Sequence, residues 1–296
     1  MKLNPDKQRE YLWLALSEGY LSVARFYVQN RGSLNIRHDF GMTPLHVAVV
    51  NDQTEIVNFL INHLDDLNLL DGTGQTALFL AVMRGNLEIC RLLIENGANV
   101  NALNSNGQTP VRAALPKWAS KLDSHDSILA LLVENGANLH MIRINEETVH
   151  PLHLATMLRF NTGVSAMLQR GVDANIKDYD NTTALYWAVR AKNMGAATLL
   201  LHCNADVNSI NTKRRRTPLH KAAEEGDRPF VELLLGAGAD PTITDYKNRS
   251  PREAARLRKH QLEQRNRDPN YGFSAEDEQK IADLEKIIER LSPETV

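Results

Sequence analysis

The chain has 296 residues, 43% of them hydrophobic and 24% charged, which excludes an intrinsically disordered protein and leaves room for a substantial core. A formal net charge of −2 argues against a protein dedicated as a whole to binding polyanions, and two cysteines are too few for a disulfide framework or a cysteine-based zinc site. No apolar run is long enough for a membrane-spanning helix or a signal peptide, so we expect a soluble, intracellular protein without membrane contact.

A sequence pattern recurs along the chain after an irregular apolar start. It is seen as GMTPLHVAV from Gly41 and as GQTALFLAV from Gly74. The anchor position of successive copies is held by Pro44, Ala77, Pro110, Pro151, Ala184, Pro218 and Pro251. Their spacings are 33, 33, 41, 33, 34 and 33 residues, and Tyr11 in YLWLAL lies 33 residues before the first anchor. A sustained period of this length predicts repeated units that stack on one another.

Each period is typical of two helices followed by a polar loop. A threonine such as Thr43 suits the N-cap of the first helix, and the proline after it suits the first helical position. Small residues such as Ala48 let neighbouring helices approach closely, while Gly85 and Gly97 are placed to end a first and a second helix. About 13 residues rich in Asn, Asp and Gly then predict a projecting turn or hairpin, which we call a finger.

These motifs together resemble the ankyrin repeat family. The resemblance rests on the 33-residue period, on TPLH-x-A, and on a second motif at fixed offset, as in LLIENGANVN at 92–101, and it covers roughly residues 7–260. It implies an all-α solenoid of about seven to eight helix-turn-helix units with projecting fingers. We assign a degenerate N-terminal cap unit to 1–40, the repeat array to 41–248, a partial last repeat to 249–268, and a linker with an amphipathic capping helix to 269–296.

Two places break the period. The unit that starts at Pro110 is eight residues too long, and we assign about six of them to an insert near 116–126 and about two to 141–150. Trp118 lies in the first insert, where it either packs on the lengthened helix junction or anchors a partner. In LINHLDDLNLLDG the usual Gly-Ala is replaced by Leu64-Asp65, which predicts a helix end of different geometry.

The ends of a repeat array must present a polar outer face, because the last unit has no neighbour. At the C-terminus, SAEDEQKIADLEKIIERL starts with a capping box formed by Ser274 and Asp277. The apolar stripe of this segment consists of Ile281, Leu284, Ile288 and Leu291. The stripe spans only about two heptads, so we expect this helix to pack on the last repeat rather than to form a coiled-coil dimer.

The sequence lacks the motifs of a catalytic site. No metalloprotease, phosphate-loop, serine-hydrolase or zinc-finger spacing is present. His46, His153 and His220 share one position of the repeat, and the family resemblance implies that this histidine hydrogen-bonds between units. We therefore expect a protein that is not an enzyme and that needs neither a cofactor nor a metal.

The resemblance implies recognition through a concave surface made by the finger tips and the first helices. Most of these positions are polar, and the exceptions are Met, aromatic and Arg residues, which are typical of interface hot spots. The predicted partner-binding residues are Phe40, Met83, Arg84, Trp118, Met157, Leu158, Arg159, Phe160, Tyr179, Arg190, Lys213, Arg214, Arg215, Arg216 and Tyr246. The alternative for Met157 and Leu158 is that they pack under the preceding insert.

Charge is unevenly distributed near the C-terminus. Residues 213–267 carry 14 Lys/Arg against 8 Asp/Glu, and residues 268–296 carry 3 against 8. The run Lys213–Arg216 lies at a predicted finger tip and should be exposed. It is a solvated face, a docking patch for an acidic protein, or a nuclear-import signal, and the acidic helix either folds onto the basic region or shares its partner.

Our leading hypothesis is a monomeric, non-catalytic adaptor, scaffold or regulatory subunit that binds another protein. The alternatives are a nuclear regulator that contacts phosphates through 213–267, although nucleic acid is not the expected partner, and a substrate receptor or bacterial effector of ankyrin type, for which no recognisable box motif is present. The resemblance also implies asparagine hydroxylation at Asn101 and Asn208. We expect the protein in the cytoplasm, or in the nucleus if the basic run is an import signal.

Overall fold

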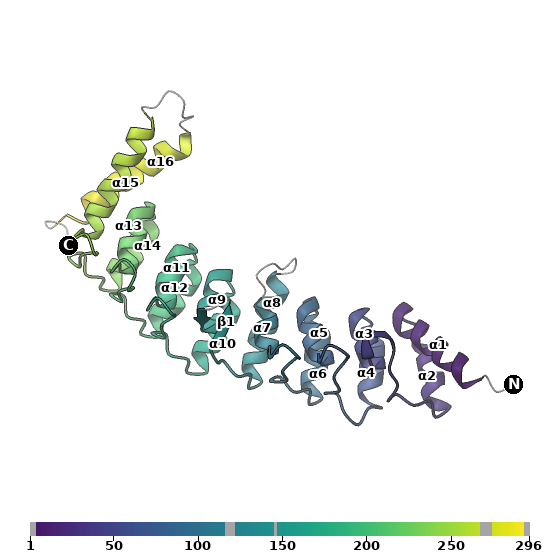
Figure 1. Cartoon of the computed structure of the whole chain (residues 1–296). Coiled ribbons are helices and arrows are strands. Elements are labelled where there is room, and N and C mark those ends of the chain that lie inside the picture. Colours follow the sequence, from purple (N-terminus) through teal and green to yellow (C-terminus); the bar gives the residue numbers. More distant parts are fainter. Residues whose placement is uncertain (1–3, 116–121, 145–146, 267–273, 293–296) are drawn as a thin grey trace. The chain divides into compact units, whose positions relative to one another are not determined.

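The computed structural model describes residues 4–115, 122–144, 147–266 and 274–292 (Figure 1). The described chain is almost entirely helical and divides into two compact units, Met1–His140 and Met141–Val296. Trp118 and most of the predicted insert lie outside the described residues.

The first unit is a stack of helix pairs. Its elements are α1 (Pro5–Glu18), α2 (Leu21–Gln29), the 3-10 turn η1 (Asp39–Gly41), α3 (Pro44–Val50), α4 (Thr54–Ile61), α5 (Ala77–Arg84), α6 (Leu87–Glu95), α7 (Pro110–Ala114) and α8 (Leu122–Glu134). The first helix of each pair packs on the first helix of the next, so that α3 contacts both α1 and α5. The second helices form a parallel row of their own from α2 to α8. This arrangement confirms the predicted helix-turn-helix unit.

The second unit continues the same pattern after a hairpin. Its elements are β1 (Ile142–Ile144), β2 (Glu147–Val149), α9 (Pro151–Leu158), α10 (Asn161–Gln169), α11 (Ala184–Arg190), α12 (Met194–His202), α13 (Pro218–Glu225), α14 (Arg228–Gly236), α15 (Pro251–Asn266) and α16 (Ala275–Arg290). The two strands pair antiparallel, with Ile142 opposite Val149. The hairpin occupies the finger in which the sequence has its second, shorter excess.

The start of each first helix follows from the Thr-Pro motif. The hydroxyl of Thr76 accepts a hydrogen bond from the backbone N–H of Phe79 at 3.2 Å, and Thr109 and Thr217 do the same for the residues three positions on. In the fourth copy of the motif His150 replaces threonine, and its Nδ1 accepts from the N–H of Leu152 at 3.1 Å. These caps satisfy N–H groups that have no partner inside the helix.

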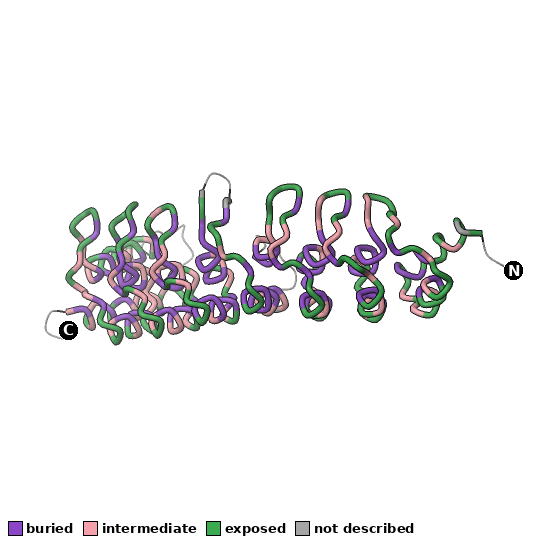
Figure 2. Tube along the Cα trace, turned by 90° about the horizontal axis from the view of Figure 1, so that it is seen from below, coloured by how far each residue is buried: buried purple, intermediate pink, exposed green. Residues whose placement is uncertain are grey.

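The core lies between the two helix rows. Figure 2 shows buried residues along the helices and exposed residues on the fingers and loops of each unit. The alanine two positions after the histidine position is completely buried in all seven repeats that carry an anchor, as Ala48, Ala81, Ala114, Ala155, Ala188, Ala222 and Ala255. A small side chain is needed there because first helices from adjacent units approach closely, as the sequence predicted.

Two kinds of helix end were predicted, and both are found. Gly85 and Gly226 take left-handed φ angles of 70° and 72° directly after α5 and α13, where a side chain would be strained. The helix α4 ends differently, at Asn62 in the right-handed region, and no described residue from 62 to 66 has a positive φ. The altered sequence at Leu64-Asp65 therefore does change the geometry of this end.

The helix α16 packs against α15, α14 and α13, which confirms that it folds back on the last repeats. Leu284 and Leu291 of the predicted stripe are buried, whereas Ile281 and Ile288 are only partly so and Ile287 is completely buried in their place. The capping box is formed, since Ser274 Oγ accepts from the N–H of Asp277 and Asp277 Oδ2 accepts from the N–H of Ser274, both at 3.2 Å.

Candidate functional site

The recurring histidines connect neighbouring repeats. His220 Nε2 lies 3.0 Å from the carbonyl oxygen of Arg249, and Nδ1 lies 2.8 Å from the hydroxyl of Thr217. His46 and His153 reach carbonyl oxygens of the next finger in the same way, at 3.0 and 3.1 Å. A carbonyl oxygen only accepts, so Nε2 donates. Burial lowers the pKa of all three imidazoles, which therefore stay neutral at pH 7. Their role is structural, as predicted.

Asparagine side chains also connect neighbouring repeats, and we call these contacts the asparagine bridges. Asn101 Oδ1 accepts from the N–H of Asn138 at 2.7 Å, and its Nδ2 donates to the carbonyl of Gly136 at 3.2 Å. Asn208 makes the equivalent contacts with Asp240 and Gly238. Asn68 and Asn175 accept from a backbone N–H of the next unit in the same manner. Hydroxylation of Asn101 and Asn208 remains a prediction.

Three consecutive fingers of the second unit are joined side by side. The N–H of Thr212 donates to the carbonyl of Asp180 at 3.0 Å, and the N–H of Tyr246 donates to the carbonyl of Arg214 at 3.2 Å. These bonds tie the fingers at 177–182, 211–216 and 245–249 into one surface. Groups carried by their tips are therefore held at fixed spacing.

The predicted basic run divides into an exposed and a buried part. Lys213, Arg214 and Arg215 are exposed, and Lys213 Nζ lies 3.6 Å from Asp180 Oδ2. Among the residues that the structure describes, no carboxylate lies within ion-pair distance of Arg214 or Arg215. Arg215 takes a left-handed φ of 51°, and the chain turns back after it. Two unneutralised guanidinium groups therefore face solvent at this tip.

The expectation that Arg216 is exposed is wrong. Arg216 is 4% exposed, and its Nη1 donates to Glu224 Oε2 at 2.6 Å while its Nε lies 3.6 Å from Asp245 Oδ2. The sequence places it beside exposed residues, but the turn at Arg215 directs the side chain inward onto two carboxylates. Arg216 thus stabilises the finger and does not contribute to its outer surface.

Asp245 is the acidic centre of this finger. Burial alone would raise its pKa, but hydrogen bonds from the Arg249 side chain and from the N–H groups of Lys247 and Arg249 lower the pKa of Asp245 to about 2. Its Oδ2 accepts from Arg249 Nη2 at 2.7 Å. The carboxylate therefore stays charged at neutral pH and holds two arginines in place.

Aromatic rings lie beside the exposed cations. Tyr179 and Tyr246 are exposed on the flanking fingers, and Lys247 Nζ lies 5.4 Å from the ring centroid of Tyr246. We define the basic finger surface as Tyr179, Lys213, Arg214, Arg215, Tyr246 and Lys247. The fingers thus bring together five of the predicted binding residues and add Lys247. Phe40 is exposed on a finger of the other unit.

Trp187 supports a finger of the second unit, and this role was not predicted from the sequence. Its Nε1 donates to Asp178 Oδ2 at 2.8 Å, and the guanidinium carbon of Arg190 lies 4.7 Å from the ring centroid. The indole therefore links α11 to the base of a finger and carries the predicted residue Arg190 on its face. A signal existed, because Trp occupies a repeat position held elsewhere by Val47 or Leu80, and its N–H needs an acceptor when buried.

The predicted residues on the first helices differ in exposure. Met83 and Arg84 are exposed at the end of α5, and Met157 and Arg159 are exposed at the end of α9, with Leu158 half-buried. Phe160 is 2% exposed, so its assignment as a binding residue is wrong. The reason is that Arg159 takes a left-handed φ of 64° after α9, which turns Phe160 into the core at the start of α10.

The family profile of ankyrin repeats, described as three copies, matches residues 12–104, 59–143, 117–211 and 152–245. The chain belongs to the ankyrin repeat family. Ankyrin repeats mediate protein–protein interactions, and this family assignment supplies that coarse function for the array. No helix of the described part is long and apolar enough to cross a membrane, and no group of three metal-binding side chains gathers there.

Curated relatives match only part of the chain. The ankyrin chain is 33% identical over 118 residues to ankyrin repeat and SOCS box protein 16 of Mus musculus, which covers 37% of this chain and 26% of the relative. It is 32% identical over 108 residues to the B-cell lymphoma 3 protein homolog of Mus musculus, covering 35% and 24%. A match of 34% identity to the palmitoyltransferase Hip14 of Drosophila melanogaster covers 28% of this chain and 13% of that protein. The matches thus span about a quarter or less of these relatives.

The solved ankyrin repeat domain of human ASB11 has the same fold. Its structure is similar with a TM-score of 0.57 and 21% identity, covering 83% of this chain and 98% of that one. At this identity the likeness concerns the fold alone. The repeat geometry described above is therefore that of a known ankyrin domain.

Proposed function

We propose that this ankyrin array is a non-catalytic binding module that docks an acidic segment of a partner protein on the basic finger surface. The proposal rests on one observation, the exposure of Arg214 and Arg215 between Tyr179 and Tyr246 on three hydrogen-bonded fingers. Arginine and tyrosine are the residue types that contribute most at interface hot spots. Carboxylates of a partner can pair with the guanidinium groups bidentately while its apolar groups contact the rings.

Neighbouring charges are arranged so that the positive field is concentrated at these tips. Arg249 is paired with Asp245, and Lys259 of α15 lies 2.8 Å from Glu285 of α16. Arg252 donates to the carbonyl of Ile288 at 3.1 Å. One ion pair and one backbone hydrogen bond thus join the acidic C-terminal helix to the basic helix behind it, while no carboxylate of the described residues lies within ion-pair distance of Arg214 or Arg215 of the finger. Charge of this kind accelerates association and selects acidic partners.

The fingers also lower the cost of binding. Their backbones are fixed by Asp178 and Asp245, whose Oδ1 atoms each accept two N–H groups of their own finger. Binding therefore orders only a few long side chains, because the supporting loops are already ordered. Arg190 on Trp187 and Met157 on α9 extend the surface along the first helices.

The test is affinity capture of partners with the full chain and with the double variant Arg214→Glu, Arg215→Glu. Both residues are exposed, so folding should be unchanged, while capture of an acidic partner should fall by on the order of a hundredfold. The matched control is Arg228→Glu with Arg256→Glu, which makes the same charge change at exposed helix positions of the same unit. Equal loss in the control, or no loss in the finger variant, contradicts the proposal.

A separate arm asks whether the site extends to the first helices. Met157→Glu is preferable to a change at Leu158, because Met157 is exposed whereas Leu158 is half-buried. We expect a smaller loss of affinity than for the finger variant, and unchanged affinity would confine the site to the fingers. Binding of plain duplex DNA that depends on Arg214 and Arg215 and falls steeply with salt would replace the protein partner by a nucleic acid.

We propose that the protein acts in the cytoplasm. The run Lys213–Arg216 contains four basic residues, but Arg216 is enclosed by Glu224 and Asp245. The exposed cluster available to an import receptor is correspondingly shorter. A fluorescent fusion that accumulates in the nucleus, and leaves it when Arg214 and Arg215 are replaced by alanine, would contradict this placement.

A further inference from the structure

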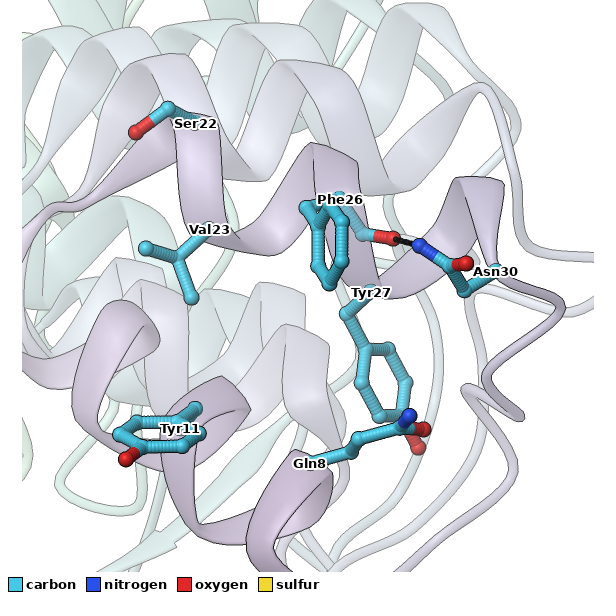
Figure 3. Close-up of a pocket in the computed structure, with 7 residues that line it drawn as sticks. All are labelled: Gln8, Tyr11, Ser22, Val23, Phe26, Tyr27 and Asn30. Atoms are coloured by element: carbon cyan, nitrogen blue, oxygen red, sulfur yellow. Dashed lines mark hydrogen bonds between the residues drawn. The ribbon is translucent and has the colours of Figure 1, made fainter. Parts of the chain in front are cut away.

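The N-terminal helix pair presents an apolar outer face. Tyr11 and Leu14 on α1 are 50% and 51% exposed, and Phe26 on α2 is 53% exposed. Figure 3 shows Tyr11, Val23 and Phe26 around an open space, with Tyr27 at its side. These groups and their polar neighbours line a hollow of about 290 Å³. Exposed apolar patches of this kind mark interaction sites on folded proteins.

The repeat register identifies this face as a stacking surface. One period after Tyr11, Leu14 and Val23 come Pro44, Val47 and Ile56, which are all buried. The helices α3 and α4 that carry them pack against α1 and α2. The positions of Tyr11 and Leu14 are therefore covered inside the array and exposed at its first pair, whereas the position of Phe26 is half-buried inside the array, at Phe59. In the described chain, the N-terminal face thus repeats part of the surface through which adjacent helix pairs stack.

At this end exposed apolar residues interrupt the polar outer face that is expected of an array end, whereas a charged helix covers the other end. In the second unit, α16 covers α13, α14 and α15 with Leu284 and Ile287 completely buried. The outer side of α16 is charged and exposed, as at Glu278, Glu285 and Glu289. A second copy of this chain therefore offers an apolar stacking surface at its N-terminal pair and a charged one on α16.

The N-terminal face is suited to contact the same face of a second copy of the chain. An exposed aromatic ring, Phe26, projects beside an apolar hollow, so the ring of each copy can enter the hollow of the other about a two-fold axis. The charges exposed on α1 are of both signs and include Lys7, Glu10 and Glu18, while Asp6 and Arg9 pair with each other at 3.8 Å. Acidic groups of one copy can then face basic groups of the other. A strongly acidic or strongly basic partner would find no such complement.

We infer that two copies of the chain associate head to head through this face, defined by Tyr11, Leu14, Val23 and Phe26, in a weak and reversible two-fold dimer. The inference departs from the monomer expected from the sequence. It is independent of the basic finger surface, which lies in the other unit. The face is small beside that of an obligate dimer, so association should depend on concentration.

Sedimentation equilibrium of the full chain over a wide concentration range tests the inference directly. Wild type should shift from the monomer mass of 33.2 kDa toward twice that mass as concentration rises. Phe26→Glu should weaken association by about tenfold or more, because it places two charges at a closed apolar contact. The matched control Phe40→Glu changes an exposed aromatic residue of the same unit outside the face and should leave association unchanged. If Phe26→Glu fails to fold by circular dichroism, Ser22→Arg at the rim serves in its place.

Cross-linking tests the two-fold geometry. Ser22→Cys in a Cys203→Ser background leaves Cys90, which is buried and whose thiol pKa is raised by burial, as the other thiol. A short bismaleimide should join two copies of this variant at concentrations where wild type associates. Glu88→Cys in the same background is the control, because Glu88 is the exposed equivalent of Ser22 two periods later.

Three results would overturn the inference. The first is a monomer at every concentration, including one in which the face binds an unrelated protein instead. The second is a dimer that withstands both Phe26→Glu and Ser22→Arg, which would place the contact elsewhere. The third is equal cross-linking of Ser22→Cys and Glu88→Cys. None of these results would affect the proposed function of the fingers.

Discussion

The first and the last helix pairs end their stacks in opposite ways. The pair α1–α2 leaves Tyr11, Leu14 and Phe26 half exposed, whereas the pair α13–α14 is covered by α15 and α16. Both pairs obey the same repeat rules. The difference comes from α15 and α16 together, of which α16 has an apolar stripe and charged flanks. The comparison teaches that the repeat itself does not decide whether an end is open or closed.

The two ends also differ in the contacts that their charged side chains make. In the last repeats Arg216 and Arg249 are held by Asp245, and α16 is fixed by Arg252, which donates to Ser292 Oγ at 2.7 Å. In the first repeats Arg37 is exposed and donates to backbone carbonyls of Gly41 and Leu70. The C-terminal end is thus stabilised by buried ion pairs as well as apolar contacts, whereas the ion pair between Asp6 and Arg9 at the N-terminal end is exposed.

The largest effect should come from emptying the C-terminal cap. Leu284→Ala removes a fully buried side chain and should lower the free energy of unfolding of the second unit by about 2–5 kcal/mol. Leu14→Ala, at the exposed end, is the control and should change stability by less than about 1 kcal/mol. Hydrogen exchange of α13 to α16 measures the loss. Similar protection in both variants would show that the cap is not what distinguishes the ends.

A smaller effect should follow from removing the buried arginine. Arg216→Ala leaves Asp245 and Glu224 without one cation and should cost roughly 2 kcal/mol. Arg37→Ala, the exposed finger arginine of the first unit, should cost less than about 1 kcal/mol. Urea unfolding of the two variants gives the comparison. Equal costs would mean that burial of the ion pair adds nothing.

The third effect in order of size should be a loss of stability of the C-terminal end at low pH. The pKa of Asp245 is about 2 in the folded chain and 3.8 in the reference state, so its contribution to stability is complete above about pH 4 and is lost as the pH falls toward 2. We expect the thermal midpoint of wild type to fall over this interval more than that of Asp245→Asn. A parallel fall in the two proteins would assign the acid sensitivity to other carboxylates.

The smallest effect on stability should come from the open face. Phe26→Ala removes a half-exposed ring and should change the free energy of unfolding by less than about 1 kcal/mol, measured under conditions where the chain is monomeric. A loss as large as that of Leu284→Ala would mean that the face is already packed, and the contrast between the ends would disappear.

The fold was predictable because the period places every helix. The repeats are marked by helix starts at Thr-Pro, by buried alanines and by helix ends at glycine. Each of these features depends on a few neighbouring residues, so it can be recognised in the sequence. The inter-unit hydrogen bonds of His46 and His220 followed from the family resemblance. The C-terminal helix could be placed from its stripe, although Ile287 replaced Ile288 as a buried residue because packing against three helices rotates the contact face.

The candidate site was only partly predictable, because side-chain burial depends on residues far along the chain. Arg216 is enclosed by Asp245, which lies 29 positions later, and a basic run gives no sign of that partner. Phe160 is turned inward by a left-handed residue that is not a glycine. Trp187 became visible as a binding element only when Asp178 and Arg190 were found at its indole. The open N-terminal face likewise required knowing what lies against it.

The asparagine bridges carry a consequence for how such a gene changes length. Each bridge needs only one amide side chain and a main-chain group from the following period, so a duplicated or deleted whole period arrives with its own connector and fits its new neighbours. Loss of part of a period would leave an asparagine side chain without the backbone group of the next repeat to which it bonds. Gain or loss of a whole period should therefore disturb these contacts less than loss of part of one.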